Sequence, residues 1–193
     1  MDMSASYIPA AEEYLPDIDI VFDRFHVMAL MNKAIDKVRR HQCKKLNKEE
    51  KKAVKGKRFL LLKNYSSLSE KQVDQVNSLF SANIPLFQAH SLKEQLRLFW
   101  DMDDSSKAAK FLLDWIDGAR FTKLKPLITV ANTLETHFHA LLNYYKHKIS
   151  NGKAEGVNNK IKTLKRQSYG FRDNEYFKLR LYHLHAQKYK LCG

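Results

Sequence analysis

From about residue 44 to residue 150, apolar residues recur every three or four positions, and this periodicity limits the fold more than any other feature of the sequence. One predicted helix opens with Ser69 and Gln72 at the spacing of a capping box. Further along, Gly118 is typical of a helix C-cap, and Pro126 stands near the start of a helix expected to exceed twenty residues. We therefore expect an all-α module of amphipathic helices in this part of the chain.

The N-terminal part carries a different signal. Residues 18–22 form a β-branched and aromatic run between acids, which predicts a buried strand. Asp23 then stands at the C-terminal end of this strand, the edge at which functional side chains collect in open α/β sheets. A short helix that stops at Pro16 is expected before the strand, and a longer helix after it. The expected fold class is therefore α+β, predominantly α, with a large all-α insertion.

Charge is distributed unevenly along the chain. The net charge of +13 is concentrated in two blocks. Residues 33–63 hold thirteen bases and three acids, and residues 151–193 hold ten bases and three acids. Basic blocks of this kind favour contact with a polyanion, because each Lys or Arg that meets a phosphate releases a condensed counterion. Nucleic acid is therefore the expected partner.

Several other classes of protein are disfavoured by the sequence. No apolar run approaches the roughly 20 residues that span a bilayer, and the first residues lack the pattern of a secretory signal. Cys43 and Cys192 form no metal-binding or redox pair, which suits a reducing compartment. No glycine-rich phosphate loop or nucleophilic Cys/His pair is present. We expect a cytoplasmic protein with no membrane partner and no small-molecule substrate.

Glu155 is the one acid in a segment that otherwise fills with Lys, Arg and Asn, "NGKAEGVNNKIKTLKRQ". It has two interpretations. It can sit in the first turn of a helix, where a carboxylate meets free N–H groups and the positive end of the dipole. Alternatively it is a metal ligand, with Lys162 two turns further on the same face and available for phosphate. Asn158 and Asn159, poor helix formers, fit contacts to the site or to a DNA backbone.

The strings around Glu155 and Asp23 resemble one known family. "ISNGKAEGVNNKIKTLKRQSYGFRD" is similar to the third-carboxylate segment of bacterial insertion-sequence transposases of the ISL-three family, and "VFDRFHVMALMNKAIDKVRR" resembles its "DRFH" segment. "DMSASYIPA" resembles the stretch that precedes this segment. The resemblance implies a ribonuclease-H-like fold and three acids, Asp-Asp-Glu, that bind two divalent metal ions. It implies parts of that fold in residues 1–42 and 150–193, with an all-α insertion over residues 43–149.

The resemblance also implies roles for individual residues. Glu155 matches the third acid, and Asp2 matches the second, with Asp23 as the alternative; Asp2 and Glu155 are thus the expected ligands of Mg²⁺ or Mn²⁺. His26 is expected to support the site, as are Asn158 and Asn159. Basic residues of the two charged blocks are expected to contact DNA: Arg39, Arg40, Lys160, Lys162, Lys165 and Arg166.

The chain departs from the family pattern at its start, because the first acid belongs on a strand upstream of residue 1. We therefore expect a C-terminal fragment of a transposase that is inactive by itself, with the metal bound only in the complete protein. In that protein it would serve cleavage and joining of phosphodiesters at double-stranded transposon ends. The alternative is a non-catalytic module for DNA binding or oligomerisation. A bacterial, nucleoid-associated location and self-association are expected in either case.

Overall fold

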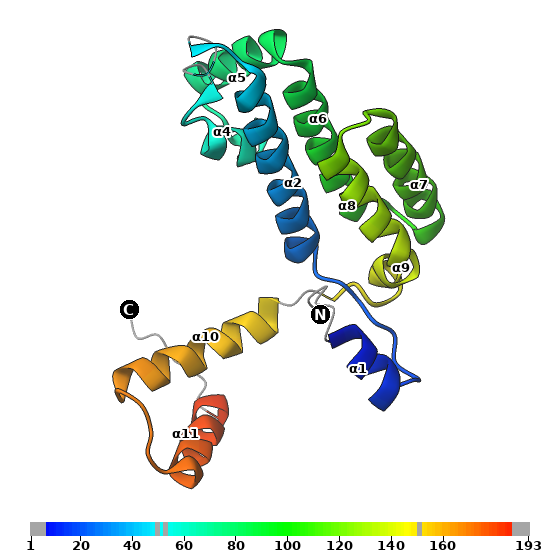
Figure 1. The fold of residues 1–193 in the computed structure, drawn as a ribbon. Helices are drawn as coiled ribbons and strands as arrows, with labels where there is room; N and C mark the ends of the chain where they lie inside the picture. Colours follow the sequence, from blue (N-terminus) through cyan, green and yellow to red (C-terminus); the bar gives the residue numbers. More distant parts are fainter. Residues whose placement is uncertain (1–6, 49–50, 52–53, 150–151, 187–193) are drawn as a thin grey trace. The chain divides into compact units, whose positions relative to one another are not determined.

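The structure is a computed structural model, and it describes residues 7–48, 51, 54–149 and 152–186. The chain divides into two compact units, residues 1–149 (unit 1) and 150–193 (unit 2). Figure 1 traces the helices along the chain. Unit 1 contains α1 (Tyr7–Tyr14), α2 (Arg24–Lys45), α4 (Arg58–Leu62), η1 (Tyr65–Ser67), α5 (Glu70–Ala82), α6 (Ile84–Leu98), η2 (Phe99–Asp101), α7 (Ser105–Phe121), α8 (Lys125–Thr136) and α9 (Phe138–His147). Unit 2 contains α10 (Gly152–Gln167) and α11 (Asn174–Ala186).

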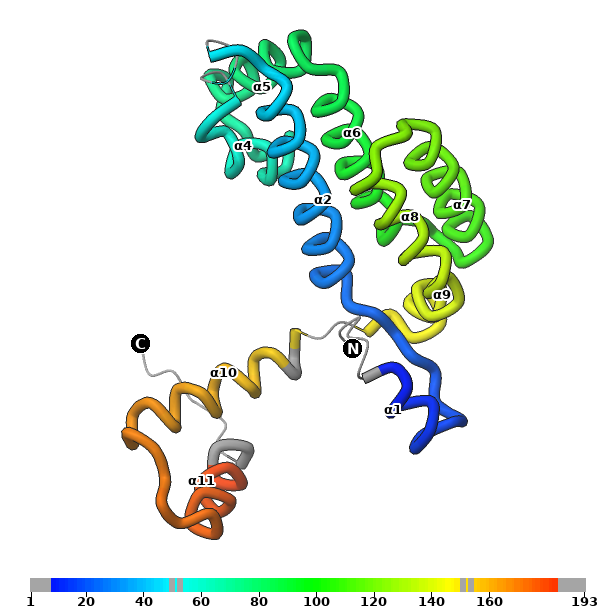
Figure 2. Tube along the Cα trace, in the orientation of Figure 1, coloured from blue at the N-terminus to red at the C-terminus, as the bar shows by residue number. Residues whose placement is uncertain are grey.

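The predicted α+β class is wrong, because the described residues are helical and contain no strand of the expected partial ribonuclease-H-like sheet. The segment 18–22 runs without regular structure between α1 and α2, as the tube in Figure 2 shows. A strand needs a neighbouring strand to take up its backbone hydrogen bonds. Here the carbonyl of Ile20 instead accepts a hydrogen bond from Asn143 Nδ2 at 3.0 Å, and the buried Phe22 ring meets the edge of His137. Val21 and Phe22 of this segment are buried, whereas Ile18 is exposed.

The core of unit 1 lies where α2, α6, α7 and α8 meet. α2 packs against α6 and α8, and α7 packs against α8 and α6. One face of α2 supplies buried apolar residues at helical spacing: Val27, Met31, Ala34, Ile35 and Val38. Trp100 and Trp115 are both buried, and Trp115 Nε1 donates a hydrogen bond to the carbonyl of Leu92 at 2.8 Å. Burial of these faces, at about 25 cal/mol per Å² of apolar surface, is what holds the helices together.

Local sequence explains where several of these helices begin. The capping box predicted at Ser69 and Gln72 is present at the start of α5. The Asn83 side chain caps α6 by accepting from the backbone N–H of Leu86, and Pro126 stands in the first turn of α8. The first turn of a helix leaves its N–H groups without partners in the helix. The side chains of Ser69 and Asn83 accept hydrogen bonds from such groups, and Pro126 has no N–H group that needs a partner.

Two predicted helix ends are wrong. Gly118 does not end its helix, because α7 continues to Phe121 and Gly118 lies inside it beside Leu92. The helix expected to run more than twenty residues from Pro126 is two helices, since α8 ends at Thr136 and α9 starts at Phe138. His137 stands between them with φ −105° and ψ 21°, outside the helical range.

Unit 2 is a pair of helices joined by residues 168–173. α10 buries Leu164, and its apolar neighbours Val157 and Ile161 lie on the same face. The turn after α10 is a Schellman motif, in which the N–H of Gly170 donates to the carbonyl of Lys165 at 3.0 Å and the N–H of Tyr169 donates to that of Arg166 at 3.2 Å. Gly170, with φ +103°, suits a position that side-chain-bearing residues rarely adopt.

Candidate nucleic-acid interface

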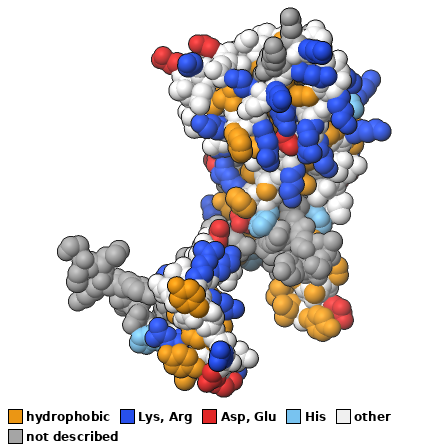
Figure 3. All heavy atoms as spheres, turned by 60° about the vertical axis from the view of Figure 1, so that its left-hand side comes forward, with side chains coloured by type: hydrophobic (Ala, Val, Ile, Leu, Met, Phe, Trp, Pro, Cys, Tyr) orange, Lys and Arg blue, Asp and Glu red, His pale blue; other side chains and the backbone are white. Residues whose placement is uncertain are grey.

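The face of α2 opposite the core is a row of basic side chains. Lys33, Lys37, Arg40 and Lys44 are all exposed and follow one another at intervals of four, three and four residues. That spacing places them on one stripe of the helix, turned away from the stripe that packs on α6 and α8. Figure 3 looks onto the side of unit 1 that carries α2 and α4, and Lys and Arg side chains gather there. We call Lys33, Lys37, Arg40 and Lys44 the basic stripe.

Beside the basic stripe, one carboxylate collects three arginines. Asp36 Oδ1 accepts hydrogen bonds from Arg39 Nε and Nη2 at 3.0 and 2.8 Å, and Asp36 Oδ2 lies 3.0 Å from Arg40 Nε. Arg58, the first residue of α4, brings its Nε to 3.7 Å from Asp36 Oδ1. Burial of Asp36 acts to raise the pKa of its carboxyl, but the hydrogen bond and charge of Arg39 and the charges of Arg40 and Arg58 lower this pKa below its usual value. Asp36 is therefore ionised at neutral pH and fixes this arginine cluster.

A basic hollow of about 390 Å³ lies next to the cluster. It is lined by Arg39, Cys43, Lys44, Lys51 and Lys55. Four of its five lining residues carry a positive charge, so an anion that enters the hollow meets several cations at once.

Asp23, the alternative second acid, has a structural contact. Its Oδ1 accepts a hydrogen bond from the backbone N–H of Phe25 at 3.1 Å and so caps the N-terminus of α2. The next residue, Arg24, lies over the ring of Trp100 with its Cζ 5.3 Å from the centroid, and donates to the carbonyl of Arg97 at 3.3 Å. His26 follows on the first turn of α2, partly exposed and in edge contact with Phe25. The "DRFH" string thus fixes the start of α2.

Glu155 lies in the first turn of α10 and is exposed. Asn159, Lys162 and Arg166 follow it at intervals of four, three and four residues, on the face opposite Leu164. This second polar face has Asn158 and Lys165 at its edge. The remaining predicted DNA contact of α10, Lys160, is also exposed.

One of these side chains is engaged within unit 2. The ammonium of Lys165 lies over the ring of Phe177 at 4.9 Å from its centroid, a cation–π contact between α10 and α11. Lys165 therefore serves the packing of unit 2 as well as its surface charge.

The described residues do not fit a metal site. They contain no group of three or more His, Cys, Asp or Glu side chains that could hold an ion. Asp2 lies outside the described residues, and Asp23 and Glu155 belong to different units. Two-metal sites require several carboxylate oxygens around ions about 4 Å apart. Within the described residues, no set of carboxylates meets this requirement.

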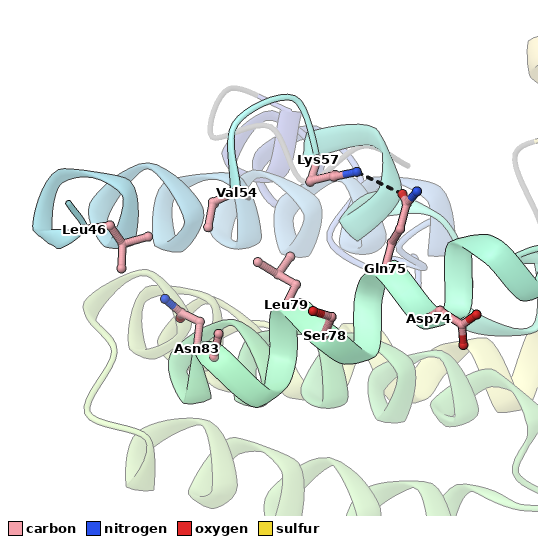
Figure 4. A pocket seen from close by; sticks show the side chains of 9 residues that line it. Leu46, Val54, Lys57, Asp74, Gln75, Ser78, Leu79 and Asn83 are labelled. Carbon is pink, nitrogen blue, oxygen red and sulfur yellow. Dashed lines mark hydrogen bonds between the residues drawn. The ribbon is translucent and has the colours of Figure 1, made fainter. Parts of the chain in front are cut away.

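A separate pocket of about 440 Å³ opens between α5 and the end of α2 (Figure 4). Apolar side chains of Leu46, Val54 and Leu79 face its interior, while Lys57 Nζ donates a hydrogen bond to Gln75 Oε1 at 2.9 Å at its rim. Its polar groups are thus partly engaged with one another.

Within residues 33–63, sequence reasoning named Arg39 and Arg40 as DNA contacts and did not single out the lysines of the basic stripe, Asp36 or Arg58. Asp36 precedes Arg39 and Arg40 by three and four residues, a helical spacing that was visible in the sequence. The approach of Arg58 depends on the packing of α4 against α2 and leaves no local signal.

Fold and charge together define a helical module with one strongly basic face. The transposase family model of the DDE, ISL3 type matches residues 1–181. The transposase for insertion sequence element IS1001 of Bordetella parapertussis is 32% identical over 184 residues, which cover 94% of this chain and 45% of the relative. The transposase for insertion sequence element IS1557 of Mycobacterium tuberculosis is 27% identical, over 83% of this chain and 41% of the relative.

The chain therefore belongs to the ISL3 family of DDE transposases, as the strings around Asp23 and Glu155 predicted. It spans less than half the length of these curated relatives. No solved structure matches it significantly. In the described part of the chain, no helix is both long and apolar enough to cross a membrane.

Proposed function

We propose that this chain is the C-terminal part of an insertion-sequence transposase and that the basic face of unit 1 holds double-stranded transposon-end DNA. The observation that carries the proposal is the basic stripe of α2, whose opposite face is fixed in the core. A rigid helix with cations at intervals of three and four residues presents a line of charge to a phosphate backbone. Arg39 and the lysines of the adjacent hollow extend this surface.

Glu155 is proposed as the third acid of the catalytic set, and Asp2 as the second. Asp23 is the weaker choice because its carboxylate caps α2. On this proposal Asn158, Asn159, Lys160, Lys162, Lys165 and Arg166 position DNA near Glu155, and His26 supports the site. Mg²⁺ or Mn²⁺ would be bound only in the complete protein, where it would serve hydrolysis and joining of phosphodiesters.

A second function, DNA binding without catalysis, is favoured by one observation. The basic stripe and the Asp36 cluster lie wholly within unit 1, whereas Glu155 lies in unit 2. A chain of this composition would bind DNA through unit 1 whether or not Glu155 has a role. On either function the protein would be found with the bacterial nucleoid. Self-association is proposed as well, since Leu179 and Tyr182 on α11 are exposed apolar side chains.

The experiment compares binding of duplex DNA by the purified 193-residue chain and by two charge-matched variants across ~50–200 mM salt. Lys37→Gln/Lys44→Gln removes two members of the basic stripe. The control, Lys110→Gln/Lys125→Gln, removes two exposed lysines of α7 and α8. The slope of log K against log salt is negative, and we expect the first variant to make it less steep by about 2. The control should leave the slope nearly unchanged.

Two outcomes would overturn the proposal. The wild-type chain would fail to bind duplex DNA at low salt, or both variants would lose affinity equally. Equal loss would mean that net charge alone, and not the face of α2, attracts the DNA.

A further inference from the structure

Arg40 and Arg58 approach the same carboxylate from two different helices and with the same atom. The Nε of Arg40 lies 3.0 Å from Asp36 Oδ2, and the Nε of Arg58 lies 3.7 Å from Asp36 Oδ1. Their side chains remain 62% and 53% exposed, while that of Asp36 is 12% exposed. Among the described residues, Asp36 is the only acid that pairs with either arginine.

The third arginine of the cluster has a different position. Arg39 uses both Nε and Nη2 on Asp36 Oδ1, and its side chain is only 15% exposed. Arg39 therefore neutralises and orients the carboxylate from within, whereas Arg40 and Arg58 reach the surface. An arginine whose Nε faces a carboxylate leaves its two terminal Nη groups, with their parallel N–H bonds, available to a second anion. The guanidinium of Arg58 also lies over the ring of Phe59, with its Cζ 5.5 Å from the centroid.

We propose that Arg40 and Arg58, held in place by Asp36, form a bidentate site for DNA phosphate groups within the basic face. The inference rests on the proposed function, because the phosphates are those of the DNA that the basic face holds. Terminal guanidinium nitrogens match the oxygens of a phosphate two by two, which lysine cannot do. Holding both side chains in advance lowers the side-chain entropy lost when the phosphate binds.

The proposal makes Asp36 a positioning residue whose effect runs against its charge. Simple electrostatics predicts that removing a carboxylate from a DNA-binding face tightens binding, since the face gains one unit of positive charge. Loss of positioning predicts the reverse, because Arg40 and Arg58 become free to move and must be ordered by the DNA. The sign of the change in affinity therefore separates the two.

The first test compares Asp36→Asn with Asp114→Asn in binding of a duplex DNA probe at ~100 mM salt. Asp114 is an exposed acid on α7 and provides the same change in charge away from the cluster. We expect Asp36→Asn to weaken binding about fivefold, and Asp114→Asn to leave it unchanged or slightly tighter. A tighter complex with Asp36→Asn would overturn the proposal.

The second test does not depend on the stability of the Asp36 variant. Arg40→Lys and Arg58→Lys keep the charge and change only the geometry of the donor, at exposed positions. We expect each to weaken binding about three- to tenfold, while Arg120→Lys, the same exchange at an arginine of α7 that pairs with Glu135 away from the basic face, changes it less than twofold. Unchanged affinity for both Arg40→Lys and Arg58→Lys would show that only charge matters here. Failure of the wild-type chain to bind the probe would overturn the proposed function, and this site with it.

Discussion

Lys93 reaches from α6 to the C-terminal end of α4, where its Nζ donates a hydrogen bond to the carbonyl of Leu61 at 3.1 Å. The same ammonium donates to the carbonyl of Lys63 and lies 2.9 Å from Glu94 Oε1. Its side chain is 1% exposed. A helix C-terminus leaves its last carbonyls without partners and carries partial negative charge, and a buried cation satisfies both. Lys93 thereby joins α6 to the helix that supplies Arg58.

Replacing Lys93 should destabilise unit 1. Lys93→Met keeps most of the length of the side chain but removes the ammonium from the two carbonyls and from Glu94, which then has Arg97, at 4.0 Å, as its cationic partner. We expect the free energy of unfolding to fall by about 2–4 kcal/mol, measured by urea denaturation. Lys110→Met, an exposed position on α7, should change it by less than about 0.5 kcal/mol. A similar small change for Lys93→Met would mean that water replaces the ammonium without cost.

His90, one turn before Lys93, should make stability depend on pH. Burial is the main cause that lowers the pKa of His90 to about 4. The charge of Lys93, whose Nζ lies 3.3 Å from His90 Nε2, lowers this pKa further, and the charge of Glu94 acts to raise it. Unfolding returns the pKa to about 6.5, so the unfolded chain binds more protons between these values. Stability is then fully present above about pH 6.5 and is lost as pH falls toward 4.

The size of this loss can be measured by difference. We expect the free energy of unfolding of the wild-type chain to fall by about 1–3 kcal/mol more between pH 7 and pH 4 than that of His90→Gln. Equal pH dependence in the two proteins would assign the loss to other groups.

Gly118 offers a test of the path of α7. Because the helix continues to Phe121, Gly118 lies in a helix interior, and a Cβ added there would meet Leu92 Cδ2 at 3.8 Å, an ordinary contact. Gly118→Ala should therefore stabilise the protein by about 0.5–1 kcal/mol, seen as a higher midpoint of thermal unfolding. If Gly118 ended the helix in a left-handed conformation, the same exchange would be destabilising.

Asp23 should be replaceable by another capping residue. Asp23→Ser keeps an oxygen that can accept from the N–H of Phe25, whereas Asp23→Ala does not. We expect Asp23→Ala to cost about 1 kcal/mol of stability and Asp23→Ser to cost less, with DNA binding nearly unchanged in both. A loss of DNA affinity in the stable Asp23→Ser variant would indicate a role beyond capping.

Glu155 should separate binding from catalysis. In the 193-residue chain, Glu155→Gln should leave DNA affinity within about twofold, because it removes no phosphate contact. In the complete transposase it should abolish strand cleavage, measured on a labelled transposon end, if Glu155 binds the metal. The Lys162→Gln variant is the contrast, since it should weaken DNA binding and leave Glu155 in place.

Features that depend on neighbouring residues in the sequence were predicted correctly. Features that depend on contacts with distant parts of the chain were not. The capping box at Ser69 was predicted correctly, because its signal depends on residues only three positions apart. The predicted strand at 18–22 was wrong, because an apolar run does not show whether its residues pack in a sheet or against helices. Glycine at position 118 predicted a helix end, but it lies inside α7, where an added Cβ would make only an ordinary contact with Leu92.

The candidate interface divides in the same way. Positive charge around residues 33–63 was evident from composition, and the basic stripe follows from the spacing of its lysines. The ion pair between Arg58 and Asp36 depends on the packing of α4 against α2, which no local sequence pattern predicts. The metal ligands stay a prediction, since Asp2 lies outside the described residues.

The packing of α2 against α6 and α8 also sets the order in which unit 1 can fold on the ribosome. α2 is made before the surfaces that cover its apolar face, which belong to residues 84–98 and 125–136. At about 5–20 residues per second, several seconds pass before α8 leaves the exit tunnel, and until then the apolar face of α2 lacks that cover. Contacts so distant in sequence also slow folding relative to bundles whose neighbouring helices pair in turn. Nascent chains of this protein should therefore engage holdase chaperones through residues 27–38 until α8 has emerged.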